Sequence, residues 1–319
     1  MKVLVTGAGG FVGQRLVARL LADGALGAPV ERIDLIDLRF DGLPEDTRLR
    51  RHRGSFGDGE TLEAALADRG GDVVFHLASL AGGAAEADYE AGRRVNLDAT
   101  LALFDRLGRR SAAGDAPPVV VFASSIAVYG APLPSPVDDR TLPRPVLSYG
   151  AHKLAAELVL QDLSRIGRID GRGLRLPGIV ARPRGASAGL RSAFMSELMW
   201  AAAVGEPYVC PVSPQAVAWW MSADCCVDNL LHAAQLDGRA LEGGRVWPLP
   251  VLRLTVAEVV EALARRFGDG CRASIAYAPD AGLEAVFGSF PPLLAGEAER
   301  LGFRHDGSAD ALVRNALAA

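Results

Sequence analysis

Apolar residues in this chain recur with two different spacings, and the two spacings alternate along its first half. Short apolar runs predict strands near residues 2–6, 32–37, 48–53, 72–77, 118–123 and 172–177. Between them, apolar residues spaced for one helix face predict helices near 11–23, 59–69, 85–109 and 149–166. Alternating strands and helices favour an α/β fold with a doubly wound parallel sheet. Segments 41–46 and 131–145 indicate loops.

The pattern changes beyond residue 177. Further helices are predicted near 190–204, 222–236 and 255–267, and short strands near 246–249 and 272–277, among many prolines and glycines. We therefore expect a first domain over residues 1–177 and a smaller α/β domain, mainly for substrate binding, over 178–319. Part of 215–236 is expected to pack back on the first domain.

Glycines mark the end of the first predicted strand. Gly7, Gly10 and Gly13 precede or open the first predicted helix, where backbone can approach a pyrophosphate at the helix N-terminus. Asp37 ends the second predicted strand, where a carboxylate hydrogen-bonds an adenosine ribose 2′-hydroxyl and repels a 2′-phosphate. This favours NAD over NADP, although Arg39 could weaken the preference. Asp37 could instead be an ordinary turn residue.

Chemistry is indicated by a lysine in a chain that otherwise uses arginine. Only Lys2 and Lys153 are lysines among 34 Lys plus Arg. Lys153 follows Tyr149 by four residues on a helix for which Ser148 is a possible N-cap, so phenol and ammonium share a face. An ammonium lowers the pKa of a nearby phenol and makes it usable as a general acid/base. The alternative is an incidental pair on a surface helix.

Charge and cysteine content exclude several functions. The net charge is −4 with a pI near 5.8, and the sequence shows no basic patch. We therefore do not expect nucleic acid as a partner. Four cysteines and five scattered histidines show no metal or redox spacing, which fits a reducing cytosol. No apolar run is long enough to span a membrane. The chain enters the glycine turn at once, which leaves no room for a signal peptide, so we expect a cytoplasmic protein.

Five motifs in order resemble the extended short-chain dehydrogenase/reductase family, in its NAD-dependent epimerase/dehydratase branch. They are Thr6-Gly7-x-x-Gly10-x-x-Gly13, His76-Leu77-Ala78, Asn96, the run from Ser124 to Gly130, and Tyr149-x-x-x-Lys153. The resemblance implies a Rossmann-type fold, an NAD cofactor, and a homodimer in which helices 85–109 and 149–166 form a four-helix bundle with their copies.

The same resemblance implies roles for single residues. Ser125 would orient the substrate, Tyr149 would be the acid/base, and Lys153 would hold the nicotinamide ribose and tune Tyr149. Ser55 departs from the family's Gly-Asp-x-x-Asp pattern, although Phe56 could pack on the adenine. The cofactor-binding residues would be Gly7, Gly10, Phe11, Val12, Asp37, Ser55, Phe56, Leu77, Ala78, Ser79, Asn96, Tyr149, Lys153 and Pro177.

The absence of an arginine from one motif bears on the class of substrate. Nucleotide-sugar members carry an Arg-Asp-Phe-like motif that grips the diphosphate, whereas residues 218–224 contain Trp219-Trp220 and no arginine, unless Arg191 replaces it from elsewhere. Residues 124–132 and 174–192 resemble a D-erythronate dehydrogenase group, which oxidises a four-carbon sugar acid at C2. Candidate substrate-binding residues are Ser79, Ser125, Tyr149, Arg182, Arg184 and Arg191.

Three functions therefore stay open. The first is an NAD-dependent dehydrogenase for a small sugar acid. The second is a nucleotide-sugar epimerase or dehydratase that retains NAD, and the third is a non-catalytic NAD-sensing protein. The intact Ser125, Tyr149 and Lys153 set disfavours the third.

Overall fold

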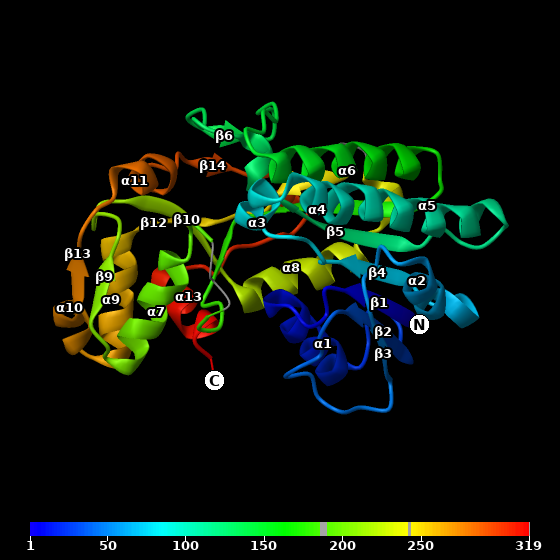
Figure 1. Ribbon diagram of the computed structural model, residues 1–319, viewed down its shortest axis with the longest axis horizontal. Coiled ribbons are helices and arrows are strands. Elements are labelled where there is room, and N and C mark those ends of the chain that lie inside the picture. Colours follow the sequence, from blue (N-terminus) through cyan, green and yellow to red (C-terminus); the bar gives the residue numbers. More distant parts are fainter. Residues whose placement is uncertain (186–189, 242–243, 319) are drawn as a thin grey trace. The chain divides into compact units, whose positions relative to one another are not determined.

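A computed structural model describes residues 1–185, 190–241 and 244–318 of the protein (Figure 1). The chain forms two compact units, each assembled from several segments. The first unit contains residues 1–128, 145–175 and 227–247, and the second contains 129–144, 176–226 and 248–319.

The first unit is built on a seven-stranded sheet with the strand order β11-β7-β5-β4-β1-β2-β3 (Figure 1). The ladders that join β5, β4, β1, β2 and β3 are parallel. This confirms the predicted Rossmann-type parallel sheet. The strands are β1 (Lys2–Thr6), β2 (Arg32–Asp37), β3 (Leu49–Arg53), β4 (Val73–His76), β5 (Val119–Ser125), β7 (Asp170–Leu176) and β11 (Val246–Pro248).

Strand order creates a ligand-binding position within this unit. From β1 the chain moves outward to β2 and β3, and it then returns to the other side of β1 to form β4, β5 and β7. The loops after β1 and β4 therefore leave in opposite directions. In open parallel sheets, ligands bind at the carboxyl ends of the strands at such a switch point.

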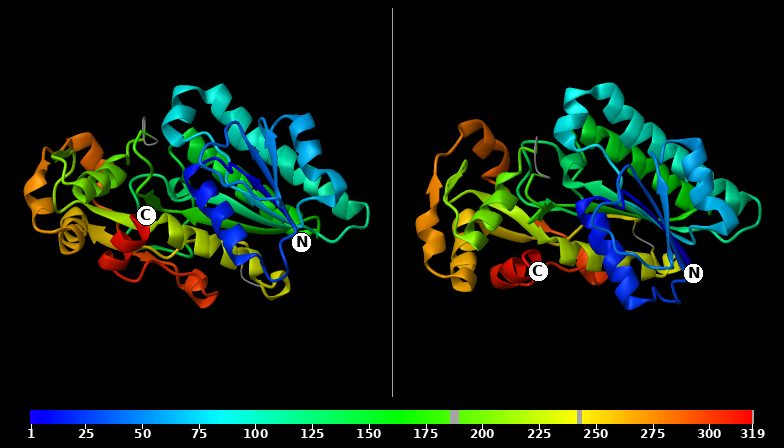
Figure 2. Two further views of the ribbon diagram at one scale, coloured as in Figure 1. Left: turned by 90° about the horizontal axis from the view of Figure 1, so that it is seen from below. Right: turned by 60° about the horizontal axis from the view of Figure 1, so that its bottom comes forward.

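Helices cover both faces of the sheet because successive strand residues alternate between the faces. Leu4, Val74 and Phe122 pack with Leu103 and Leu160 in one core cluster. Figures 1 and 2 show α5 and α6 side by side on this face and α1 on the other. The helices are α1 (Phe11–Asp23), α2 (Gly59–Leu66), α5 (Ala99–Ala112), α6 (Ser148–Arg165) and α8 (Ala223–Gln235), with short 3-10 turns at Ala67–Arg69, Ile126–Tyr129 and Gly238–Ala240.

The helix predicted over 85–109 is instead four consecutive segments. They are α3 (Gly82–Ala87), α4 (Tyr89–Arg93), a π-helical turn η2 (Arg94–Asp98) and α5. Asp88 has extended backbone between α3 and α4, and its side chain accepts a hydrogen bond from the Ala91 N–H at 2.9 Å. A local side-chain cap thus restarts the helix, which apolar spacing alone does not reveal.

The predicted N-cap at Ser148 is wrong. Ser148 is the first helical residue of α6, and the capping position belongs to Leu147, which supplies no side-chain hydrogen bond. The Ser148 N–H donates to the Glu86 carboxylate at 2.5 Å. A residue distant in sequence therefore satisfies the first N–H of this helix, as helix ends require.

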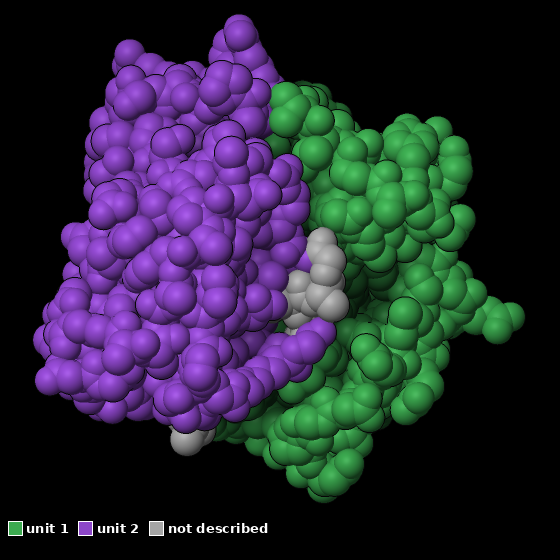
Figure 3. Space-filling model, turned by 60° about the vertical axis from the view of Figure 1, so that its left-hand side comes forward, with its two compact units in different colours: residues 1–128, 145–175, 227–247 green, residues 129–144, 176–226, 248–319 purple. Residues whose placement is uncertain are grey.

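The second unit has three small sheets, with strand orders β12-β10-β8, β13-β9 and β14-β6. Its residues are coloured separately in Figure 3. A core cluster that includes Trp220, Leu198 and Val259 holds its helices on these strands. Its elements are β6 (Val137–Asp138), β8 (Gly178–Val180), α7 (Phe194–Val204), β9 (Tyr208–Cys210), β10 (Val217–Ser222), β12 (Leu252–Thr255), α9 (Val256–Phe267), α10 (Gly270–Ser274), β13 (Ile275–Tyr277), α11 (Ala281–Phe287), β14 (Leu293–Leu294), α12 (Gly296–Arg300) and α13 (Ala309–Ala316).

Two features beyond residue 177 differ from expectation. The strand expected at 246–249 is β11, and it extends the large sheet of the first unit. The stretch before α8 is the buried strand β10, which apolar residues on both faces had hidden from the period-two pattern.

Candidate active site

The turn after β1 depends on glycine at particular positions. Gly7 has φ of +75°, and a Cβ there would lie 2.7 Å from the Ala78 backbone nitrogen. A Cβ on Gly13 would lie 2.1 Å from the Gly7 carbonyl oxygen. Gly9 was not singled out from the sequence, yet its Cβ would lie 2.1 Å from the Arg39 carbonyl oxygen. Only glycine permits this close approach of loops.

Asp37 is fixed against the same turn. Its Oδ2 accepts a hydrogen bond from the Gly9 N–H at 2.9 Å, and its Oδ1 accepts from the Leu38 N–H at 2.7 Å. The carboxylate therefore has one orientation at the end of β2. Carboxylate oxygens can accept further hydrogen bonds, so this fixed group can still meet a hydroxyl.

Ser55 and Phe56 follow β3 but face different surroundings. Ser55 is exposed, and its Oγ accepts a hydrogen bond from the Gly57 N–H at 3.2 Å. The Phe56 ring is only 5% exposed and packs edge-on against His76, with ring centroids 4.9 Å apart. Phe56 is thus a core residue in this structure, and packing of its ring on an adenine stays a prediction.

The loop after β4 is held by Asn96. Asn96 is buried in the π-helical turn, where its Oδ1 accepts from the Leu80 N–H at 2.7 Å and its Nδ2 donates to the Leu80 carbonyl at 2.9 Å. Leu77 and Ala78 are half-buried and Ser79 is exposed. The amide therefore fixes the backbone next to these three residues, and π-helical turns occur often at such functional positions.

His76, which precedes that loop, joins three elements. Its Nδ1 is 2.7 Å from the Thr6 Oγ1 of β1, and its Nε2 is 2.9 Å from the Thr100 Oγ1 of α5. Burial first, and then the charge of Lys153, lower the pKa of His76 to about 3. His76 is therefore neutral near pH 7 and acts as a connector between elements.

Ser125 lies at the carboxyl end of β5, as the sequence predicts. It is half-buried, and its Oγ accepts a hydrogen bond from the Ala127 N–H at 3.1 Å. That contact leaves the hydroxyl hydrogen available to a ligand oxygen. Ser124 points the other way and is buried.

Tyr149 and Lys153 share one face of α6, and the Lys153 Nζ is 5.7 Å from the centroid of the Tyr149 ring. Lys153 is almost fully buried, and its Nζ donates to the Ala123 carbonyl at 2.8 Å. Burial lowers the pKa of Lys153 to about 7, and the carboxylate of Glu157 opposes that shift. The α6 lysine thus meets the end of β5, and Ser125, Tyr149 and Lys153 belong to one unit of the structure.

Glu157 was not identified from the sequence, although it follows Lys153 by four residues. It is fully buried and forms an ion pair with Arg175 of β7, with its oxygens 3.0 Å from Nε and 2.8 Å from Nη2. Ser124 donates a hydrogen bond to Glu157 at 2.5 Å. The i, i+4 spacing was the signal that could have found it.

The remaining expected residues belong to the second unit. Pro177 is buried between β7 and β8. Arg184 is exposed and pairs with Glu206 at 2.8 Å, and Arg191 donates to the Gly282 carbonyl at 3.1 Å. Residues 186–189, within the stretch 174–192 used for the resemblance, lie outside the described residues.

Arg182 has the most constrained backbone of the three arginines. Its N–H donates to the Ser196 Oγ at 3.2 Å, and its carbonyl accepts from the Trp200 Nε1 at 2.6 Å. Ala181, the residue before it, is buried with φ of +59°. Such strain persists only where surrounding contacts determine the conformation, and it is found often at functional sites.

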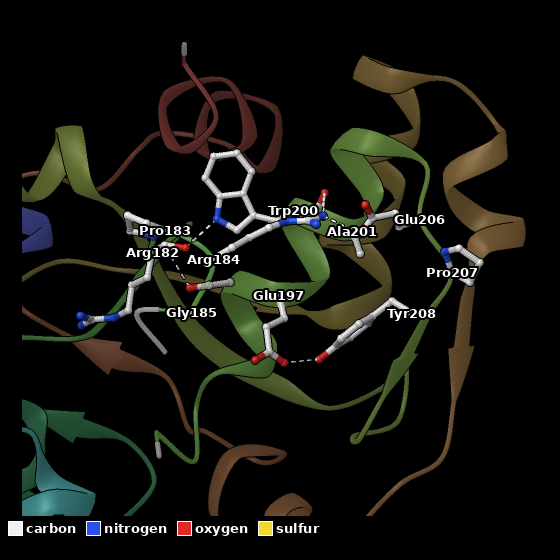
Figure 4. A pocket seen from close by; sticks show the side chains of 11 residues that line it. Arg182, Pro183, Arg184, Gly185, Glu197, Trp200, Ala201, Glu206, Pro207 and Tyr208 are labelled. Carbon is white, nitrogen blue, oxygen red and sulfur yellow. Dashed lines mark hydrogen bonds and ion pairs between the residues drawn. The ribbon is translucent and has the colours of Figure 1, made fainter. Parts of the chain in front are cut away.

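Two of these arginines, Arg182 and Arg184, line a pocket of about 240 Å³ in the second unit. Figure 4 shows Arg184 extending toward Glu206 and Arg182 extending in the opposite direction. The Tyr208 hydroxyl donates to Glu197 at 3.1 Å across the pocket. The lining residues are Arg182, Pro183, Arg184, Gly185, Ser196, Glu197, Trp200, Ala201, Glu206, Pro207 and Tyr208.

Trp219 and Trp220 are both buried structural residues of β10. The Trp219 Nε1 donates to the Pro291 carbonyl at 2.8 Å, and the Trp220 Nε1 donates to the Leu254 carbonyl at 3.1 Å. With both indoles occupied inside the unit, this strand offers no cationic side chain for a diphosphate.

Comparison with known proteins now assigns the family. Residues 3–238 match the model of the NAD dependent epimerase/dehydratase family. The chain belongs to that family. Its membership confirms the resemblance inferred from the five motifs, and it supports binding of NAD(H).

Similar proteins of this family extend over nearly the whole chain. A D-erythronate dehydrogenase of Cupriavidus necator is 39% identical over 98% of this chain and 97% of its own length. A D-erythronate dehydrogenase of Haemophilus influenzae is 32% identical over 96% of this chain and 95% of its own. The structure of a nucleoside-diphosphate-sugar epimerase from Agrobacterium tumefaciens has a TM-score of 0.90 and 36% identity, covering 98% of this chain and 92% of that one.

The turn after β1 fits the dinucleotide of an epimerase/dehydratase family member. Gly10 is the N-cap of α1 and has no side chain to cap the helix, and the first turn of α1 contains no acidic residue. N–H groups and the positive end of the helix dipole are thus offered to a pyrophosphate without a competing carboxylate. Gly7, Gly10, Phe11, Val12 and Asp37 would hold the adenosine diphosphate part of NAD.

Among the described residues, no group of three or more His, Cys, Asp or Glu side chains is arranged to hold a metal ion. In the same part of the chain, every helix is too short or too polar to cross a membrane.

Proposed function

We propose that this protein is an NAD-dependent dehydrogenase that oxidises the C2 hydroxyl of a small sugar acid such as D-erythronate to the 2-oxo acid. The observation that carries the proposal is similarity over nearly the whole chain to two proteins named D-erythronate dehydrogenase. The Ser125, Tyr149 and Lys153 arrangement in one unit supports it, because these groups can handle the proton that such an oxidation releases.

In the proposed mechanism, the chain's own residues manage the proton and the charge on oxygen. Tyr149, as phenolate, takes the hydroxyl proton of the substrate. Ser125 donates a hydrogen bond to the substrate oxygen and holds it in line with Tyr149. The Lys153 ammonium favours the phenolate form of Tyr149 and would hold the nicotinamide ribose. The hydride leaves the same carbon, and bound NAD would supply the acceptor for it.

Asp37 is proposed to select NAD over NADP. Its carboxylate is fixed at the end of β2 by the Gly9 and Leu38 N–H groups, so it cannot easily turn away from a 2′-phosphate. Arg39 follows two residues later and is exposed. We therefore expect preference rather than complete exclusion of NADP.

Arg182 is proposed to bind the substrate carboxylate. Arg184 already pairs with Glu206, and Arg191 is exposed and donates to a backbone carbonyl. Arg182 has both of its backbone groups bound by α7 side chains, which orients the residue before any ligand arrives. Those contacts fix the backbone from which the guanidinium extends, and a guanidinium can bind a carboxylate through two parallel hydrogen bonds.

A nucleotide-sugar epimerase or dehydratase is the second candidate, and the Agrobacterium tumefaciens structure favours it by its name. Against it, Trp219 and Trp220 occupy the strand where a diphosphate-binding arginine is expected in nucleotide-sugar members.

We also propose a homodimer through α5 and α6, because Leu158 of α6 is an exposed apolar residue on this helix pair.

Turnover type separates the two candidates. With D-erythronate or a related tetronate, we expect NADH absorbance at 340 nm to accumulate over many turnovers per enzyme, since a dehydrogenase must release NADH each cycle. UDP-glucose and UDP-galactose are the matched comparison, assayed by product analysis. Conversion of a UDP-sugar without net NADH would replace the proposal with the second candidate.

Tyr149→Phe keeps the ring volume but removes the acid/base. We expect kcat to fall about 10²–10⁴-fold with little change in KM for NAD, because positioned proton transfer contributes about that much. Lys153→Met should impair both kcat and NAD affinity. Circular dichroism verifies folding, and a folded Tyr149→Phe protein with near-wild-type kcat contradicts the mechanism.

Asp37→Ser should lower the preference for NAD, measured as kcat/KM with NAD divided by kcat/KM with NADP. The substitution removes the charge that repels a 2′-phosphate and keeps a hydroxyl for the ribose. Arg39→Ala serves as the control and should raise this ratio in favour of NAD. Equal use of both cofactors by the unchanged protein would show that Asp37 does not select.

Arg182→Met should raise KM for the sugar acid about 10-fold or more while KM for NAD changes little, since a bidentate charged pair is lost. Arg184→Met removes a guanidinium that already pairs with Glu206, so it should leave KM for the acid within about twofold. Steady-state kinetics with the acid varied distinguish the two. Equal effects of both substitutions would refute the assignment of Arg182.

A further inference from the structure

A buried carboxylate lies one helical turn beyond Lys153. Glu157 is fully buried on α6, and the mechanism above does not use it. Removing a carboxylate from water is costly unless it is paired and hydrogen-bonded. Glu157 meets both conditions, with two contacts to Arg175 at 3.0 and 2.8 Å and one hydrogen bond from Ser124 at 2.5 Å.

The partners of Glu157 place it next to the catalytic residues. Lys153 binds the carbonyl of Ala123, and Glu157 binds the hydroxyl of Ser124. Two charged side chains of α6 thus hold two consecutive residues of β5, and the next residue along the strand is Ser125. Arg175 comes from β7, the neighbour of β5 in the sheet.

We propose that Glu157, secured by Arg175 and Ser124, is a positioning residue of the catalytic set, and that it is the counter-ion that keeps the buried Lys153 ammonium charged. The positioning part of this proposal rests on the proposed function. The counter-ion part requires only that the Glu157 carboxylate acts on the Lys153 ammonium.

The groups around Lys153 explain why a counter-ion is needed. The Lys153 Nζ lies 4.7 Å from the centroid of the Phe122 ring and 5.7 Å from that of Tyr149, and these ring faces compensate little for lost water. His76 on β4 is neutral near pH 7, because burial holds its pKa at about 3. Arg175 on β7 is cationic. Glu157 is the carboxylate that acts on Lys153 and opposes the lowering of its pKa by burial.

The direction of the effect follows from these charges. Without the Glu157 carboxylate, burial acts unopposed, so Lys153 loses its proton at a lower pH than in the unchanged protein. A neutral Lys153 no longer favours the Tyr149 phenolate. Activity on the alkaline side should then decline at a lower pH as well.

The chain's composition makes the test direct. Because Lys2 and Lys153 are the only lysines, protein labelled with ¹³Cε-lysine gives two side-chain NMR signals whose shifts report each pKa. Lys2 is half-buried at the N-terminus and serves as the internal reference. Lys153→Met, which removes one signal, assigns the spectrum.

The main variant is Glu157→Gln with Arg175→Gln, since Glu157→Gln alone would strand a cation that is only 12% exposed. Relative to Arg175→Gln alone, which differs from this double variant only in keeping the carboxylate, we expect the Lys153 midpoint to be lower by about one pH unit or more. In Arg175→Gln alone, the Glu157 carboxylate remains and no longer pairs with Arg175. Its charge then acts more strongly on Lys153, so the Lys153 midpoint should rise. Ser124→Ala removes a hydrogen bond but no charge, so its midpoint should stay within about 0.3 unit of the unchanged protein.

The outcomes separate this inference from the proposed function, because the titration needs no substrate. A folded double variant whose Lys153 midpoint equals that of Arg175→Gln overturns the inference, as does an Arg175→Gln midpoint that falls below that of the unchanged protein. If the midpoints move as expected but D-erythronate gives no NADH, the counter-ion role stands and the proposed substrate fails. Where D-erythronate is oxidised, the alkaline limb of kcat/KM should shift with the midpoint in each variant.

Discussion

The burial of two opposite charges on one helix constrains the first unit most strongly. Lys153 and Glu157 are both out of water on α6, and each is satisfied by a group at the end of β5 or on β7. Because an unpaired buried charge is so costly, α6 can dock on the sheet in one register only. This register fixes the positions of Tyr149 and Ser125. The arrangement that supports the proposed chemistry is therefore also the one that satisfies the buried charges.

A second constraint acts on the other side of the switch point. The hydroxyls of Thr6 and Thr100 bind the two nitrogens of His76, which ties β1 and β4 to α5. Gly7 and Gly9 then let the loops after β1, β2 and β4 approach each other closely. The turn offered to a dinucleotide is thus rigid, and little ordering cost remains to be met when a ligand binds.

Family membership leaves the chemistry of the substrate open, because one fold hosts many reactions. The residues proposed to discriminate among substrates belong to the second unit, where Trp219 and Trp220 are buried by packing and the arginines at 182 and 184 have different environments. Arg184 is neutralised by Glu206, whereas Arg182 is oriented through its backbone. Under the proposed function, substrate preference would therefore depend on how α7 and β10 are packed.

Local patterns in the sequence were sufficient for much of the fold and part of the site. Strand-helix alternation, the glycine turn and the Tyr149 to Lys153 spacing each depend on residues close in sequence, so they predicted the parallel sheet and the shared face of α6. Contacts between distant segments decided the rest: Glu86 supplies the partner that Ser148 was expected to provide, Phe56 turns inward to His76, and β11 joins the large sheet. Glu157 shows the difference most clearly, because its spacing from Lys153 is local, but its burial and its pairing with Arg175 arise only when β5, β7 and α6 meet.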